Sequence, residues 1–411
     1  MTTTAGRFRT TRVTGSWLVA AAFLVTMLGA TLPTPLYPLY QQELGFGGLM
    51  VTVVFATYAV GVLAALLLVG RLSDQIGRKA VLFPGLGVAA ASSLVFVIPH
   101  SLTALFAGRL LSGVSAGVFT GVATATIVDL APASGRARAG LLAAVVNVLG
   151  LGLGPVVAGA LADHAPYPLV LPYLLHVALV ALAAVGLAAV PEPITRGEGP
   201  VRVQVQRLGV PEEVRPTFVR AAVGGFAGFA VLGFFTAVSP LFLAQVLHET
   251  SHLLTGLTVF TLLGSATVGQ VASARLPERT SLLGGCLALA AGTGVVAVGL
   301  VTALLPVVLA GAVVAGLGQG ASFRAGLQAV TGAAPADRRS EVSSSFFLVL
   351  YVAISIPVIG VGAGAQVFGL VPTAVVFAGR DRGAAGRRRV REPAPPPELS
   401  TRMERTRRSV R

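Results

Sequence analysis

Charged residues are scarce in this 411-residue chain: Asp, Glu, Lys and Arg make up 11% of it, against about a quarter of an ordinary soluble domain. Cys286 is the only cysteine, which excludes an internal disulfide and a cysteine-based metal site. The sequence also shows no cluster of metal ligands and no nucleophile–base set. We therefore expect no enzyme activity, no catalytic residue, no metal and no cofactor.

Apolar residues dominate instead, forming 54% of the chain and giving it a mean hydropathy of +0.83. They recur in stretches of roughly 20 residues, long enough for a helix to cross the hydrocarbon core of a bilayer. The stretches lack the alternation of barrel strands, so helices are expected. The predicted spans are 16–39, 49–69, 79–98, 102–131, 138–162, 167–190, 218–244, 252–273, 280–299, 302–333 and 341–363, and a twelfth begins near 366 and ends early.

Basic residues precede the first span and fill alternate loops, whereas the opposite loops hold no Lys or Arg. By the positive-inside rule, both termini are predicted to be cytoplasmic. Lys79 is the only lysine, which indicates a GC-rich bacterial gene and hence a multi-pass protein of a bacterial inner (plasma) membrane. The basic loop residues are Arg7, Arg9, Arg12, Arg71, Arg78, Lys79, Arg136, Arg138, Arg196, Arg202, Arg207, Arg215, Arg338 and Arg339.

The formal net charge of +14 does not indicate a nucleic-acid partner. About half of it lies in 380–411, where eleven Arg and four acidic residues give +7. The remainder is the charge that sets membrane topology. The expected surroundings are therefore a lipid bilayer, with no nucleic acid bound.

An internal repeat divides the chain into two halves. Residues 113–132 align with 316–335 at an offset of 203, and Pro155 aligns with Pro357 at an offset of 202. Parallel repeats of six helices are typical of secondary transporters with a cavity between the halves. The predicted parts are a cytoplasmic N-terminus 1–15, a six-helix bundle 16–190, a cytoplasmic linker 191–217, a second bundle 218–379 and a basic tail 380–411.

The loop 70–79 between the second and third spans reads GRLSDQIGRK. It resembles the loop motif Gly-x-x-x-Asp-Arg-x-Gly-Arg-Arg/Lys of the major facilitator superfamily, with Gln75 in place of the usual basic residue. The resemblance covers roughly 16–379. It implies an all-α polytopic membrane protein of two pseudo-symmetric six-helix bundles, here with an apparently truncated twelfth helix.

This loop is predicted to form half of a conformational latch. Asp74 can face the positive end of a helix dipole, which the resemblance places at the start of the eleventh helix, 340–343. Arg78 can pair with Asp129 at the inner end of the fourth helix. The expected latch, which would close the cytoplasmic side in the outward-facing state, consists of Gly70, Asp74, Gly77, Arg78 and Asp129.

Arg109 begins a second motif, Arg109-x-x-x-Gly113-x-x-x-Gly117, in the fourth helix. It lies about 10 Å deep if the helix enters near Ser101. A charge at such depth is costly and usually functional. The resemblance implies a role in proton or substrate handling; the alternative is that its long stem snorkels to the surface.

The fifth helix carries a third motif, similar to the antiporter motif Gly-x-x-x-Gly-Pro-x-x-Gly-Gly. Ala158 replaces one glycine. The resemblance points to the bacterial drug:proton antiporter branch. The matching residues are Gly150, Gly154, Pro155 and Gly159.

No Asp or Glu lies in the middle of a predicted span, so the proton-coupling step has no evident carrier. Apolar, aromatic and amide residues predominate on the helices that line the cavity in this fold, which suits a small hydrophobic or neutral ligand. We expect a small-molecule substrate, protons as the coupling ion, and a monomer. The cavity candidates are Tyr37, Phe119, Asn147, Phe234, Phe235, Gln319 and Tyr351.

The chain's end leaves the function open. Residues 380–411 are rich in Arg and Pro where the repeat predicts the rest of a helix, which favours a frameshift over a native disordered tail or a short tilted helix. The first hypothesis is proton-linked efflux of small hydrophobic or drug-like compounds by alternating access. The second is a symporter or facilitator for a small metabolite. The third is a defective, non-transporting product of a frameshifted gene.

Overall fold

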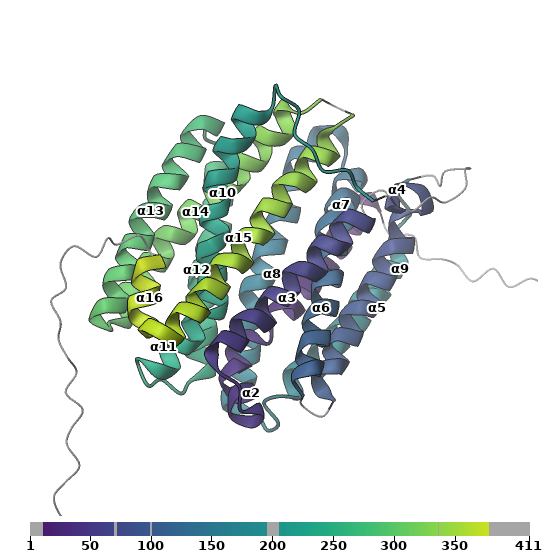
Figure 1. The fold of residues 1–411 in the computed structure, drawn as a ribbon. Coiled ribbons are helices and arrows are strands. Elements are labelled where there is room, and N and C mark those ends of the chain that lie inside the picture. Colours follow the sequence, from purple (N-terminus) through teal and green to yellow (C-terminus); the bar gives the residue numbers. More distant parts are fainter. Residues whose placement is uncertain (1–10, 70–71, 99–100, 195–204, 336, 378–411) are drawn as a thin grey trace, which may run out of the picture. The chain divides into compact units, whose positions relative to one another are not determined.

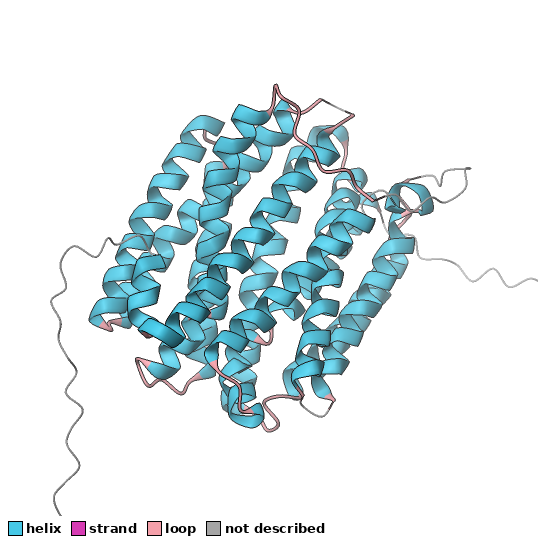
Figure 2. Cartoon of the chain, viewed as in Figure 1, coloured by secondary structure: helices cyan, strands magenta, loops and turns pink. Residues whose placement is uncertain are grey.

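The computed structural model describes residues 11–69, 72–98, 101–194, 205–335 and 337–377, and these residues form helices and their connections, without a strand (Figure 2). Eleven helical segments are long and apolar enough to cross a membrane, as predicted. The first half contains α1 (Arg12–Thr31), η1 (Thr34–Leu36), α2 (Tyr37–Leu44), α3 (Gly48–Val69), α4 (Leu72–Ile76), α5 (Arg78–Val97), α6 (Leu102–Val118), η2 (Phe119–Ala123), α7 (Thr124–Leu130), η3 (Ala133–Gly135), α8 (Arg136–His164) and α9 (Leu171–Ala189). The second half contains α10 (Arg215–Ala237), α11 (Ser239–Gln245), α12 (His252–Ser273), α13 (Glu278–Thr302), α14 (Leu305–Ala333), α15 (Arg339–Phe368) and α16 (Leu370–Phe377).

Prolines interrupt the first span of each half at equivalent places. Around Pro35, α1 gives way to η1 and α2, and around Pro240, α10 gives way to α11. Proline lacks the N–H that the helical ladder needs, which favours an interruption there, although Pro155 lies inside the continuous α8. Both interruptions lie at the same end of the bundle, where Figure 1 shows α2 and α11.

The two ends of the bundle differ in charge. The connections α4–α5, α7–α8 and α14–α15 carry Arg78, Arg136 and Arg338, and we call their side the arginine-rich end (α4 in Figure 1). The described residues of the connections at the other side, between α2 and α3, α8 and α9, α11 and α12, and α13 and α14, include no Lys or Arg. We call this the arginine-free end.

Helix pairing repeats between the halves. In the first half α3 and α5 pack on α6 and α1 packs on α8; in the second half α12 and α13 pack on α14 and α10 packs on α15. The halves meet where α8 packs on α12 and where α3 packs on α15 (Figure 1). The repeated pairing gives the two pseudo-symmetric bundles that the sequence predicted.

Glycines that align in the repeat set the closest of these contacts. A Cβ at Gly117 on α6 would lie 2.6 Å from the Val62 carbonyl oxygen on α3. A Cβ at Gly320, its counterpart on α14, would collide with the Ala266 carbonyl oxygen on α12. Small residues thus let backbones touch, as in other membrane helix pairs.

Gly320→Val is therefore expected to lower the melting temperature of the purified protein in detergent, because overpacking costs about 1–3 kcal/mol. Gly294→Val on α13 is the matched control, since nothing lies within 4 Å of a Cβ at Gly294. Equal melting temperatures for the two variants would contradict this packing argument.

The twelfth helix is short, as the sequence predicted. Its described part, α16, packs on α13 and α15, and Phe377 stacks on Phe234 with ring centroids 5.3 Å apart. In the first half the equivalent helix, α9, has 19 residues. The tail 380–411 lies outside the described residues.

Candidate functional site

A cavity of about 820 Å³ lies between the two halves at the arginine-rich end. Its wall comes from η2, α7 and α8 of the first half, and from α14, α15 and Ala274 of the second. Arg136 and Arg138 line it and are exposed, so they mark its mouth, while Asn147 lies further along α8. The volume suits a small organic molecule.

At the arginine-free end, a carboxylate links the two halves. Asp163, at the end of α8, accepts hydrogen bonds from the backbone N–H of His252 and of Leu253, both 2.9 Å away. Its oxygens also lie 2.7 Å from Ser251 Oγ and 2.8 Å from His252 Nδ1. Asp163 thus caps the first turn of α12, where unpaired N–H groups and the helix dipole favour an anion.

The antiporter-like motif packs beside this cap. Cβ atoms at Gly150 and Gly154 would meet the Leu24 and Leu28 carbonyl oxygens of α1, and one at Gly159 would meet the His252 carbonyl oxygen of α12. A Cβ at Gly256 of α12 would in turn meet the Pro155 carbonyl oxygen. The motif therefore holds α8 between α1 and α12. Its four residues lie together, as their helical spacing implies.

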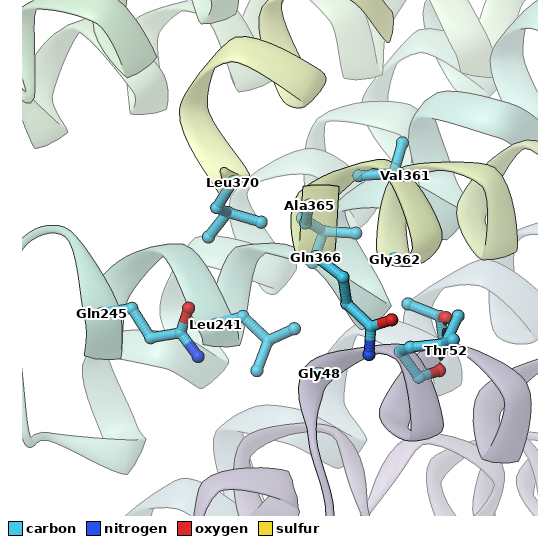
Figure 3. Close-up of a pocket in the computed structure, with 11 residues that line it drawn as sticks. Gly48, Thr52, Leu241, Gln245, Val361, Gly362, Ala365, Gln366 and Leu370 are labelled. Atoms are coloured by element: carbon cyan, nitrogen blue, oxygen red, sulfur yellow. Dashed lines mark hydrogen bonds between the residues drawn. The ribbon is translucent and has the colours of Figure 1, made fainter. Parts of the chain in front are cut away.

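The equivalent contact on the other side of the interface is looser. In the repeat, α8 corresponds to α15, and Gln366 lies near the end of α15 as Asp163 lies near the end of α8. Figure 3 shows Gln366 above the start of α3, beside Gly48 and Thr52, in a cavity of about 170 Å³. The first turn of α3 thus faces an amide where α12 faces a carboxylate.

At the arginine-rich end, Arg78 is the centre of an ion cluster. Its guanidinium lies 2.6 Å from Asp74 Oδ1, 3.1 Å from Asp129 Oδ2 and 2.7 Å from Ser73 Oγ. Glu192, after α9, caps α5 by accepting from the backbone N–H of Arg78 at 2.8 Å. The structure thus brings Asp74, Arg78 and Asp129 together.

Gly77 and Gly70 complete the predicted latch set. Gly77 has a φ of 105°, a backbone conformation in which a side chain would be strained, and this explains a glycine just before α5. Gly70 lies outside the described residues. Ser343, in the first turns of α15, lines the large cavity, as Asp129 does.

Arg109 is 1% exposed and lies in the core rather than at the surface. Its Nη1 donates to the Ala30 carbonyl oxygen at 2.6 Å, and its guanidinium lies 5.3 and 5.1 Å from the Phe55 and Tyr58 ring centroids. Its Nε has no hydrogen-bond partner. No carboxylate of the described residues lies within ion-pair distance, so cation–π contacts and a carbonyl replace a counter-ion.

Arg109 faces a small central chamber of about 40 Å³ between the halves. Phe55 and Tyr58 come from the first half, and Thr236 and Tyr351 from the second. The structure therefore does not support the alternative that the Arg109 side chain snorkels to the membrane surface.

The predicted cavity residues are spread over several sites. Asn147 lines the large cavity and Tyr351 the central chamber. Phe234 and Phe235 instead line a pocket against α13 and α16. Tyr37, Phe119 and Gln319 are buried, and the Gln319 Oε1 has no hydrogen-bond partner.

Three residues of these sites were not predicted. Asp163 was not predicted because it meets Ser251, His252 and Leu253 only through tertiary packing. Glu192 was not predicted, because it contacts Arg78 across 114 residues of sequence and no local sequence pattern marks it. Arg324 was not among the predicted site residues, but it lines the large cavity and donates to the Ser273 carbonyl oxygen at 3.1 Å.

Comparisons with solved structures support the fold. A bacterial homologue of the human lysosomal transporter Spinster, in an inward-facing and unoccupied conformation, superposes with a TM-score of 0.74, at 13% identity over 89% of this chain and 94% of that one. The human organic anion transporter MFSD10 gives a TM-score of 0.62, at 18% identity over 90% and 98%.

Sequence relatives match only a part of their own length. The quinolone resistance protein NorA of Staphylococcus aureus is 30% identical over 142 residues, which are 34% of this chain and 36% of NorA. An uncharacterised MFS-type transporter of Mycobacterium tuberculosis is 32% identical over 148 residues, 36% of this chain and 25% of that protein. The chain thus aligns with about a third or less of these curated relatives.

The family model of the Major Facilitator Superfamily matches residues 19–357, most of the helical part of the chain. Together with the eleven spans and the repeated helix pairing, this match places the chain in that family. The protein is a multi-pass membrane protein that belongs to the Major Facilitator Superfamily.

Proposed function

We propose that this protein is a secondary active transporter that exports small hydrophobic or drug-like compounds in exchange for protons. One observation carries the proposal: a cavity of about 820 Å³ lies at one end of the interface between the halves, while Asp163 caps α12 across the interface at the other end. Two bundles that close one end and open the other are the basis of alternating access.

The proposed topology follows from charge. The arginine-rich end faces the cytoplasm of a bacterial plasma membrane, because basic loops stay on that side. The described conformation is then inward-open. The organisation proposed from the repeat, 1–15, 16–190, 191–217, 218–379 and 380–411, places both termini in the cytoplasm, and the transporter works as a monomer.

Similarity to NorA, a quinolone resistance protein, supports export of drugs over uptake of a metabolite. The proposal is tested by expressing the chain in an efflux-deficient bacterial host and measuring susceptibility to a panel of drugs. Export predicts a fourfold or greater rise in the inhibitory concentration of at least one compound, and proton release from vesicles on adding it. Uptake of a small metabolite without any resistance would support the symporter alternative.

The Arg- and Pro-rich sequence 380–411, where the repeat predicts the rest of a helix, favours a second candidate, a non-transporting product of a frameshifted gene. A frameshift predicts that another reading frame of the gene, downstream of codon 379, encodes roughly ten further apolar residues, the number needed to complete a span. Resistance restored only by the frame-corrected gene would support this candidate. Resistance conferred equally by both genes would reject it.

We further propose that the ion cluster of Asp74, Arg78 and Asp129, with Gly70 and Gly77, is the first-half side of the cytoplasmic latch, which closes against the start of α15 in the outward-facing state. Asp74→Asn is expected to lower the transport rate at least fivefold while leaving expression and melting temperature unchanged. Asp74 is 61% exposed, and an exposed ion pair contributes only about 0–1 kcal/mol to stability. A loss of transport would therefore reflect the conformational cycle and not unfolding.

Glu212→Gln is the matched control, because Glu212 forms another exposed ion pair, with Arg215, at 3.4 Å. It should leave transport unchanged. Full transport by a well-expressed Asp74→Asn protein would rule out the latch.

A further inference from the structure

The charged side chains of the large cavity are strongly unbalanced. Its described lining includes three arginines, Arg136, Arg138 and Arg324, and one carboxylate, Asp129. Asp129 is already paired, since both Nε and Nη2 of Arg78 lie 3.1 Å from its Oδ2. Arg78 also pairs with Asp74, so this ion cluster keeps a net charge of −1, which the three arginines of the lining outweigh. A molecule entering this cavity therefore meets a positive potential.

Membrane topology explains only part of this charge. Arg136 and Arg138 lie at the start of α8, where the positive-inside rule expects arginines. Arg324 lies nine residues before the end of α14, about 14 Å along the helix axis at 1.5 Å per residue. A charge inside a membrane-spanning helix usually has a function.

Arg324 has most of its hydrogen-bonding capacity left over. The Ser273 carbonyl oxygen takes one bond from Nη1, out of the five N–H donors of a guanidinium. No carboxylate of the described residues lies within ion-pair distance of it. A planar guanidinium with spare donors is the side chain best suited to a carboxylate, sulfonate or phosphate group.

The wall next to Arg324 is apolar and aromatic. Phe323 and Phe347 line the same cavity, with ring centroids 6.5 Å apart, and Leu327 lies one turn further along α14. An amphipathic molecule can thus place an apolar body against these side chains while an anionic group reaches Arg324.

We propose that this cavity selects amphipathic organic anions over cations of the same size, with Arg324 as the specificity-determining residue. The inference rests on the proposed function and names its substrate class. Cations are rejected because Arg136, Arg138 and Arg324 repel them and Asp129 is occupied by Arg78. Repulsion of the wrong ligand contributes to specificity as much as attraction of the right one.

The test uses two hydrophobic ions of nearly equal size and opposite charge, tetraphenylborate and tetraphenylphosphonium. Their dissociation constants are measured by isothermal titration on the purified full-length chain in a neutral detergent. We expect tetraphenylborate to bind at least tenfold more tightly. Arg324→Gln should reduce this ratio to a third of its wild-type value or less.

Two further variants complete the test. Arg138→Gln, at the exposed mouth, should also lower the ratio and keeps the proposal testable if Arg324→Gln does not fold. Arg220→Gln removes an exposed arginine of α10 that bonds only to Pro216 and Thr217 of its own helix, and should leave the ratio unchanged. An equal or reversed preference, an unaltered ratio in both cavity variants, or binding of neither ion would overturn the proposal.

Binding can be measured whether or not the chain transports. A preserved anion preference in a chain that confers no drug resistance would remove the proposed export function but not the selectivity. Resistance to cationic drugs, conferred by a chain without anion preference, would remove the proposed selectivity but not the proposed export function.

Discussion

Asp163→Asn is expected to increase the exposure of the central chamber to the arginine-free side by about 5–30-fold. The side chain of Asp163 joins the halves by four hydrogen bonds to Ser251, His252 and Leu253. Helix caps contribute about 0.5–2 kcal/mol, and an amide cannot match a carboxylate where donors and a positive helix end converge. A loss of about 1–2 kcal/mol of this stabilisation shifts a two-state equilibrium by about 5–30-fold.

A cysteine in the chamber reports this opening. Cys286 is first replaced by alanine, and Thr236→Cys is introduced, since Thr236 lines the chamber, is 2% exposed and bonds only to its own helix. Intact cells are treated with a membrane-impermeant thiol reagent, and the labelling rate is compared with and without Asp163→Asn. On the proposed topology the reagent reaches the arginine-free end.

Glu249→Gln is the control, an exposed carboxylate in the same α11–α12 connection. It changes the charge equally and should leave labelling unaltered. The repeat provides a test in the opposite direction: Gln366→Glu puts a carboxylate beside the first turn of α3 and should slow labelling. If the thiol reagent labels the Asp163→Asn and Glu249→Gln proteins at the same rate, the Asp163 cap does not hold the arginine-free end closed.

Arg109→Met is expected to lower transport at least tenfold without lowering the melting temperature. Methionine keeps much of the stem's volume, so the core stays filled. No carboxylate of the described residues pairs with Arg109, so its removal orphans no buried charge, whereas keeping a charge in a span costs at least about 2.5 kcal/mol. We then infer that Arg109 is present in this span because transport needs it, and not because it stabilises the fold.

The same variant separates the two roles proposed for Arg109. A role in proton coupling predicts that Arg109→Met still exchanges substrate across proteoliposome membranes when no proton gradient is applied, but no longer drives export. A role in substrate binding predicts that exchange is lost too. Ser112→Ala, one turn along α6, is the control and should preserve both. Normal gradient-driven export by the Arg109→Met protein would exclude both roles, proton coupling and substrate binding.

The spans, the repeat and the family motifs could be predicted because each is a local property. A run of roughly 20 apolar residues has few alternatives to a membrane helix, whatever surrounds it. The interruptions at Pro35 and Pro240 were not predicted, because a proline can also lie inside a continuous helix, as Pro155 does in α8. The pairing of Arg78 with Asp129 was also predicted. The loop motif places Arg78 on the same side of the membrane as the end of the fourth helix, where Asp129 lies.

The faces of the helices could not be predicted in the same way. A helix that is apolar all round gives no signal of which side meets a partner and which meets lipid. Phe234 and Phe235 were therefore expected in the cavity, whereas they line a pocket against α13 and α16. Arg324 was not among the predicted cavity residues for the same reason, although it lines the cavity.

By itself, the sequence determined that this chain crosses a membrane repeatedly, in two related halves, because hydrophobic length and charge act on each segment separately. Only the tertiary structure showed which carboxylate joins the halves at the arginine-free end. That link depends on Asp163 meeting α12, 88 residues away from it at Ser251, whereas the amide of Gln366 lies beside the first turn of α3 on the other side of the interface. Contacts between halves depend on the packing of whole helices, which no single segment encodes.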